Sequence, residues 1–178
     1  MIRTLGKQIK EFKAVSILTP LCMIMEVVME TLIPLMMASI IDKGVAIGDM
    51  GHIGKMGLLM VLVAAVSLVF GTLGGVFGAK ASTGFARNLR KAMYENIQTF
   101  SFSNIDKYST SSLVTRLTTD VTNLQNAYQM ILRMCTRAPA SLIFAMIMAF
   151  SINAKLSRVY LIAIIFLSIC LCLIMKFA

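Results

Sequence analysis

The stretch that decides the fold is GLLMVLVAAVSLVFGTLGGVFGA (57–79) followed directly by KASTGFARNLRKAMYENIQTF (80–100). Residues 57–79 carry no charge, and a helix of that length crosses the roughly 30 Å hydrocarbon layer of a bilayer. Between residues 80 and 137 there is no proline, and Gly84 is the one glycine. The sequence therefore predicts a membrane helix that continues without a break into water.

Residues 80–137 have the pattern of two amphipathic helices with a break near 103–112, where serine, threonine and asparagine gather. At 1.5 Å per residue, such arms extend roughly 35 Å beyond the bilayer. We predict a long cytoplasmic helical hairpin over 80–137. The apolar positions are Phe85, Leu89, Met93, Ile97 and Phe100 in the first arm, and Leu113, Leu117, Val121, Leu124, Tyr128, Ile131 and Cys135 in the second.

The composition of the whole chain, with 58% hydrophobic and 14% charged residues, is typical of a protein embedded in a lipid bilayer. We predict an all-α membrane protein with four transmembrane helices, of which the second and third run on into the hairpin. Basic residues alternate with apolar ones in 1–13, which predicts an amphipathic interfacial helix. The predicted spans are about 14–41, 57–79, 138–154 and 159–178, with a polar loop at 42–55.

Lysine and arginine set the orientation. Segments 1–13 and 80–137 hold twelve of the 17 basic residues, which favours a cytoplasmic N-terminus in the plasma (inner) membrane. The net charge of +9 is explained by these segments, so no nucleic-acid partner is expected. The four cysteines form no CxxC pair, and His52 has no neighbouring ligands, so neither a disulfide framework nor a metal site is predicted.

Two carboxylates lie inside the first predicted span. Glu26 and Glu30 share a helix face, and with Met29 they form a candidate wall of a substrate cavity, because membrane carboxylates usually face a bundle interior or water. Two alternatives are open: the carboxylates extend to the interface, or they pair with a basic residue on another helix. For Arg133 and Arg137, anchoring to anionic lipid is the preferred interpretation.

The glycines of the second span allow two interpretations. Gly71, Gly74, Gly75 and Gly78 lie before Lys80, but they do not fit the GxxxxGK[ST] pattern of a phosphate loop. Their small-xxx-small spacing favours close helix packing in lipid instead. No nucleotide site and no enzyme activity are predicted for this chain.

Three motifs together resemble the membrane domain of ABC exporters. NIDKYSTSSLVTRLTTDVTNLQ (104–125) is similar to their first intracellular loop, in which a coupling helix precedes a signature that reads TRLTTD (115–120) here. MEVVMETLIPLMMASIIDKG (25–44) resembles their first membrane helix, and RAPASLIFAMIMAFSINAKLS (137–157) their third. The form DKYSTSSL (106–113) is similar to multidrug-type half-transporters that form heterodimers.

The resemblance implies a mechanism and partners. An ATP-binding domain, with ATP and Mg²⁺ as its cofactors, would drive alternating access, and a second half-transporter would complete the pathway. Such half-transporters have six spans, so a chain with four is expected to be a fragment, a truncated reading frame or part of a split transporter. The implied coupling residues are Ile105, Asp106, Lys107, Tyr108, Ser109 and Thr110.

Two other classes of function stay open from the residues alone. One is a membrane-anchored scaffold whose basic hairpin docks a soluble partner without transport. The other is a sensor whose hairpin relays a membrane signal. Neither interpretation requires ATP. The sequence does not identify a transported substrate, although the position of the carboxylates favours amphipathic, drug-like or cationic molecules.

Overall fold

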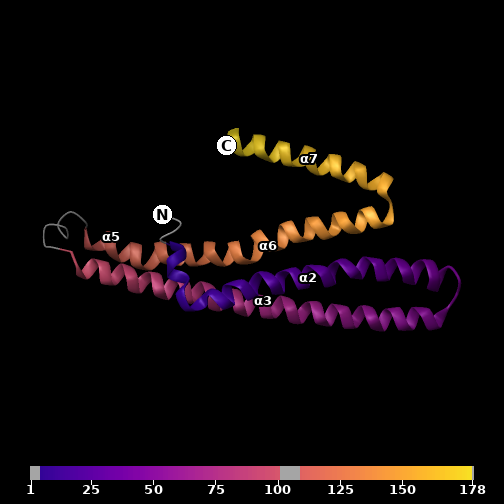
Figure 1. The fold of residues 1–178 in the computed structure, drawn as a ribbon, viewed down its shortest axis with the longest axis horizontal. Coiled ribbons are helices and arrows are strands. Elements are labelled where there is room, and N and C mark those ends of the chain that lie inside the picture. The colour runs from indigo at the N-terminus through magenta and orange to yellow at the C-terminus, as the bar shows by residue number, and fades with distance from the viewer. Residues whose placement is uncertain (1–4, 101–108, 178) are drawn as a thin grey trace.

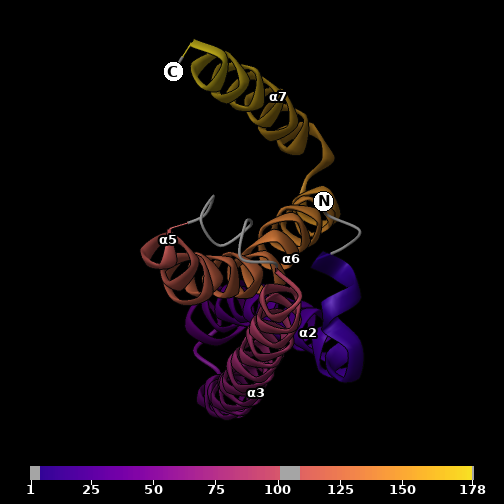
Figure 2. The same cartoon turned by 90° about the vertical axis from the view of Figure 1, so that its left-hand side faces the viewer.

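The computed structural model describes residues 5–100 and 109–177, which form helices and short connections without a strand. Three long helices lie side by side, and a fourth folds back from the end of the third and diverges (Figure 1). The view along the bundle shows this fourth helix standing away from the others (Figure 2). The main helices are α2 (Lys13–Ser39), α3 (Met50–Gln98), α6 (Val121–Ile152) and α7 (Ala154–Phe177).

Within the described residues, three helical segments are long and apolar enough to cross a membrane. They are Gln8–Val45, Met50–Gln98 and Ser111–Ile152; the first two contain the predicted spans 14–41 and 57–79, and the third contains 138–152 of the predicted 138–154. In the region of the fourth predicted span, α7 is helical over 24 residues, but the apolar segment recognised there is the shorter Ser157–Ser168. The fourth crossing therefore stays a prediction.

The second span and the first arm form one unbroken helix, α3, of 49 residues. Beyond residues 101–108, helix α5 (Thr110–Thr115) leads through a π-helical turn, η3 (Arg116–Asp120), into α6. The two arms are joined by Arg90 of α3. Its Nε donates to the Leu117 carbonyl at 3.3 Å, and its Nη2 donates to the Thr122 hydroxyl at 3.2 Å.

The apolar core lies between the arms. Phe85, Ala86 and Leu89 of α3 and Val121 of α6 form a buried cluster, and the ring of Tyr128 packs on Phe85 with centroids 4.8 Å apart. Apolar burial here excludes water and fixes the arms against each other. The partly buried side chains against the cluster are Leu5, Ile9, Met93 and Tyr128. Phe85, Leu89, Met93, Val121 and Tyr128 are thus positions at which the predicted stripes agree with the structure.

The outer edge of the predicted second stripe is not buried. Leu124 and Ile131 are 38% and 56% exposed, and Cys135 is exposed as well. A repeat of 3.5 residues drifts by about 20° per heptad on a straight α-helix, so one edge of the stripe leaves the contact surface. The face that meets α3 instead passes through Gln125 and Gln129: the Gln125 amide donates to the Thr83 hydroxyl, and the Ser82 hydroxyl donates to the Gln129 amide oxygen, both at 3.5 Å.

The N-terminal segment differs from the single amphipathic helix predicted for 1–13. Its described part is a 3₁₀-helix, η1 (Lys7–Phe12), interrupted at Lys10, where φ is 37° and ψ is −109°. The Phe12 ring covers Gly84 of α3, and the Asn88 amide donates to the Gln8 carbonyl at 3.0 Å. The apolar side of the segment therefore packs on protein, and its place at a membrane surface stays a prediction.

The loop between the first two spans is shorter than the predicted 42–55. A π-helix, η2 (Ile40–Val45), extends α2, and α3 begins at Met50. Asp49 caps α3 because its Oδ1 accepts from the amides of Gly51 and His52 at 2.9 and 3.1 Å. Gly48 has a φ of 79°, a conformation that glycine adopts without a steric penalty. This capped turn sets α2 and α3 antiparallel.

Three of the four glycines in the second span allow the close approach of α2, as predicted. A Cβ on Gly71 would lie 2.6 Å from Glu26 Oε1, and one on Gly78 would lie 3.3 Å from Thr19 Cγ2. A Cβ on Gly74 would collide with Met23. No atom of the described residues lies within 4 Å of a Cβ added to Gly75, so the packing of Gly75 stays a prediction.

Candidate functional site

The candidate site is an ion cluster between α2 and α6. Arg137 of α6 divides its two terminal nitrogens between the carboxylates of α2. Its Nη1 donates to Glu26 Oε1 at 2.9 Å, and its Nη2 donates to Glu30 Oε1 and Oε2 at 2.8 and 2.9 Å. We call these three residues the Arg137 clamp. It joins the first and third predicted spans at one level of the bundle.

Burial differs within the clamp. The Glu26 side chain is 13% exposed, whereas Glu30 and Arg137 are 45% and 41% exposed. Glu26 Oε2 is buried and has no hydrogen-bond donor among the described residues. A buried carboxylate oxygen without a donor carries a desolvation cost that pairing would offset. One acceptor in the clamp is therefore left without a partner.

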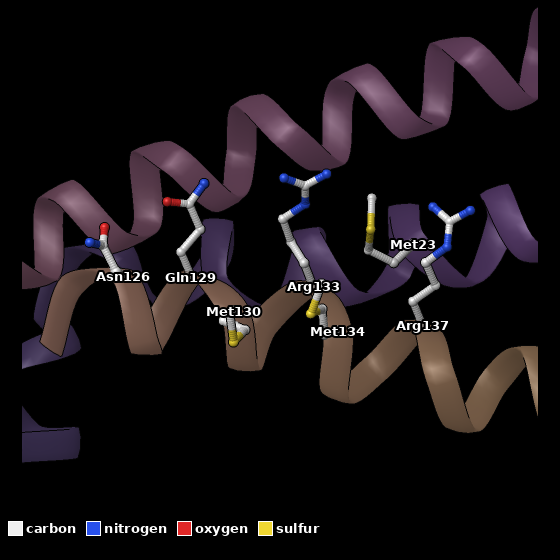
Figure 3. A pocket seen from close by; sticks show the side chains of 7 residues that line it. All are labelled: Met23, Asn126, Gln129, Met130, Arg133, Met134 and Arg137. Atoms are coloured by element: carbon white, nitrogen blue, oxygen red, sulfur yellow. The ribbon is translucent and has the colours of Figure 1, made fainter. Parts of the chain in front are cut away.

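Two hollows flank the clamp. One, of about 460 Å³, lies along α6 and is lined by both arginines, two amide side chains and three methionines. In Figure 3, Arg133 and Arg137 project from α6 in the same direction, one helical turn apart. Gln129 lies one turn before Arg133 on the same face (Figure 3). The lining is Met23, Asn126, Gln129, Met130, Arg133, Met134 and Arg137.

The second hollow, of about 600 Å³, lies on the α3 side of the clamp. It combines Glu26, Glu30 and Arg133 with small residues of α3, including Ser67 and Gly71. No ion pair or hydrogen bond joins the Arg133 guanidinium to another of the described residues. Arg133 therefore faces the same space as both carboxylates and pairs with neither of them.

These positions decide between the alternatives for the two glutamates. They pair with a basic residue on a neighbouring helix, and that residue is Arg137. The lipid-anchor interpretation is consequently wrong for Arg137, because its guanidinium is already bonded to protein carboxylates. Glu26 and Glu30 do line a hollow, whereas Met29 lines neither of the two flanking hollows. Substrate contact by these three residues stays a prediction.

Most of the predicted coupling residues lie outside the described part of the chain. Ile105, Asp106, Lys107 and Tyr108 belong to 101–108, and Thr110 is described by its backbone as the first residue of α5. Ser109 caps α5, since its hydroxyl accepts from the Ser112 amide at 3.3 Å. The TRLTTD signature falls on the end of α5 and on η3. Coupling by these six residues stays a prediction.

The pairing of Arg137 with the two glutamates was not deduced from the sequence. A signal for it was present, because Glu26 and Glu30 are four residues apart and so are Arg133 and Arg137. Residues at this spacing lie on one face of a helix, so each pair can meet the other across two facing helices. The sequence does not show which basic face meets which acidic face, and that information comes from the packing of α6 against α2.

The comparisons with known proteins agree on one family. Residues 16–178 match the ABC transporter transmembrane region. An uncharacterized ABC transporter ATP-binding protein of Bacillus subtilis, YfiB, is 34% identical over 161 residues, which cover 85% of this chain and 28% of that protein. An uncharacterized ABC transporter ATP-binding protein of Mycobacterium tuberculosis is 28% identical over 170 residues, covering 95% of this chain and 29% of the relative.

A third relative is an ATP-dependent lipid A-core flippase of Pseudomonas fluorescens. It is 31% identical over 96 residues, which cover 54% of this chain and 16% of the flippase. The chain therefore spans less than a third of the length of the curated relatives that it matches.

Proposed function

The chain belongs to the ABC transporter transmembrane region family, and from this premise we propose that it is the permease part of an ATP-driven exporter. In this proposal it moves amphipathic or drug-like molecules outward by alternating access. The family accounts for a multi-pass membrane domain that is not itself catalytic. The direction of transport, the substrate class and the mechanism are the proposal.

The observation that carries the proposal is the continuity of α3. One helix of 49 residues contains both a membrane span and an arm of the hairpin. At 1.5 Å per residue it is about 74 Å long, more than twice the thickness of the hydrocarbon layer. Arg90 and the buried cluster around Phe85 hold the second arm against it. Two joined helices transmit a displacement at their far end into the membrane as a rigid body.

We propose that this far end, Ile105 to Thr110, binds a groove of an ATP-binding domain. Ser109, within the proposed contact, caps α5, so a displacement of the tip would be passed through α5 and η3 into α6. ATP and Mg²⁺ would bind to that domain and not to this chain. Closure of two such domains would then move the hairpins of two permease subunits together.

The proposed substrate surface is the hollow that contains Glu26 and Glu30, with Met29 on the same helix. Two carboxylates share one guanidinium in the Arg137 clamp, a formal charge of −1, which the unpaired Arg133 in the same hollow balances in sum without bonding to Glu26 Oε2. An apolar cation suits such a site, because the surrounding helices present apolar side chains and the unpartnered Glu26 Oε2 accepts a hydrogen bond. Transported molecules are therefore proposed to be amphipathic and cationic.

The partner is proposed to be a different half-transporter of the multidrug type, in the plasma (inner) membrane with the N-terminus in the cytoplasm. Support comes from the DKYSTSSL form at 106–113 and from the basic residues of 1–13 and 80–137.

Replacement of Asp106 and Tyr108 by alanine in the assembled transporter tests the coupling. We expect substrate-stimulated ATP hydrolysis and ATP-driven uptake of substrate into inside-out vesicles to fall at least tenfold, because the tip no longer engages the ATP-binding domain. Asn123→Ala, an exposed change on α6, is the matched control and should leave both rates unchanged. Unchanged coupling in the double variant would contradict the proposal. A hairpin that binds its partner without ATP-linked export would favour the scaffold.

A further inference from the structure

We propose that Arg133 is an alternative partner for Glu26, and that α2 and α6 have two registers of ion pairing. In the register described above, Arg137 pairs with both glutamates and Arg133 pairs with neither. In the second register Arg133 would pair with Glu26, and Arg137 would pair with Glu30 alone. The exchange is a switch between the first and third predicted spans.

The spacing of the charges makes the exchange possible. Glu26 and Glu30 are four residues apart on α2, and Arg133 and Arg137 are four apart on α6. The two helices run in the same direction along the bundle (Figure 1). Arg137 now reaches both carboxylates, so it lies at a level between them. A slide of α6 by half a helical turn, about 3 Å, would bring each arginine level with one glutamate.

The observed register leaves two groups unsatisfied that the second register would pair. Glu26 Oε2 is buried without a donor, and the Arg133 guanidinium has no ion pair among the described residues. Pairing the two would give the buried acceptor a charged donor and each arginine its own carboxylate. Charge-assisted hydrogen bonds are stronger than neutral ones, particularly away from water.

There is room for the exchange. Arg133 lines the hollow of about 600 Å³ together with Glu26 and Glu30, so no side chain has to be displaced from between them. Gly71 and Gly75 of α3 line the same hollow. The stem of Arg133 already rests on α3, since a Cβ added to Gly78 would lie 3.6 Å from its Cγ and Cδ. The glycines keep this space open because they have no side chains.

A second contact between the same two helices holds the observed register. The Tyr128 hydroxyl of α6 donates to the Ser16 hydroxyl of α2 at 2.9 Å. The Tyr128 ring also packs against Phe85. A slide of about 3 Å would break the hydroxyl bond. The bond therefore stabilises the observed register, whereas the unpaired Glu26 Oε2 and Arg133 favour the second register. The slide would also shift α6 against α3, so the Arg90 bonds and the Ser82–Gln129 bond hold the observed register together with the Tyr128 hydroxyl.

The consequence for transport rests on the proposed function. Displacement of the hairpin tip would push α6 along its axis and bring Arg133 to Glu26. The clamp region would then lose its formal charge of −1, and Glu26 would no longer accept a bond from a bound cation. The switch would thus release a cationic molecule from the hollow when the tip moves.

The slide can be measured as a distance between spin labels at Ile17 of α2 and Ile147 of α6, in the assembled transporter in nanodiscs with its native cysteines replaced. Both positions are exposed. Ile17 precedes Glu26 by nine residues and Ile147 follows Arg137 by ten, so the vector between them lies mostly along the helix axes. Tyr128→Phe removes the bond that holds the observed register. In the absence of nucleotide, we expect this variant to populate a second distance, about 3 Å longer than the first. The population of that longer distance should rise by roughly two- to tenfold.

Arg133→Gln, added to Tyr128→Phe, should abolish that longer distance, whereas Arg158→Gln should not. Ser16→Ala breaks the same hydroxyl bond from the other helix and should reproduce Tyr128→Phe if that variant assembles poorly. The proposed switch would be overturned if the labels showed a single distance and neither Tyr128→Phe nor Ser16→Ala altered it. A failure of the transport proposal would give a different result. The variants would still change the distance between the labels, but nucleotide trapped in the ATP-binding domains would leave that distance unchanged.

Discussion

The arms of the hairpin and the predicted spans are held together by different sets of contacts. Between the arms, Phe85, Ala86, Leu89 and Val121 form an apolar core. Between the spans, glycines and the Arg137 clamp join α2 to its neighbours, while apolar residues such as Val76 point outward. Apolar burial stabilises a fold in water, but lipid removes that driving force, so close backbone contact and polar bonds replace it.

The largest expected effect is in the apolar core between the arms. Phe85→Ala should lower the free energy of unfolding by about 3–5 kcal/mol, because it removes a ring that is 4% exposed and leaves a cavity. Thermal unfolding in nanodiscs followed by circular dichroism measures the loss. Val76→Ala, 62% exposed on the membrane part of the same helix, is the control and should change stability little. Equal losses at the two positions would remove the contrast between the halves.

A smaller loss is expected at the clamp. Arg137→Met leaves the largely buried Glu26 without its cation, which should cost about 2–3 kcal/mol, less than a fully buried pair because Arg137 and Glu30 are part-exposed. Arg133→Met, one turn away, removes a cation that makes no bond in this register. It should leave the unfolding temperature nearly unchanged. If both substitutions proved neutral, the clamp would not be what joins α2 to α6.

The smallest effect concerns the glycines. Gly71→Val should destabilise by about 1–2 kcal/mol, because the new side chain meets the Glu26 carboxylate that Arg137 holds in place. Gly75→Val, on the open side of α3, should be neutral. The same unfolding measurement compares them. A larger loss at Gly75 would mean that α3 contacts another helix on that side.

The sequence predicted the helical segments well, because the uncharged runs and the absence of proline between residues 80 and 137 determine them locally. It also predicted Phe85, Leu89 and Val121 as interface residues. It did not show that Leu124 and Ile131 are exposed, because periodicity identifies an apolar stripe but not which part of it a neighbouring helix covers.

The site was only half predictable. The cost of a carboxylate in lipid indicated that Glu26 and Glu30 face other groups. Which group they face depends on how far α6 has advanced along α2, and that register is set by distant contacts such as Tyr128 with Ser16. The sequence alone therefore assigned both arginines to lipid, and the packing separates them.

The π-helical turn η3 determines the direction in which Ser109 and the start of α5 face. A π turn contains one residue more than the hydrogen-bond ladder of an α-helix would hold over the same rise. One residue corresponds to about 100° of rotation. If Arg116–Asp120 were wound as a regular helix, Ser109 and the start of α5 would point to a different side of the molecule. This single additional residue sets the direction in which Ser109 and the start of α5 face about the axis of α6, and the Arg90 bond to the Leu117 carbonyl fixes it.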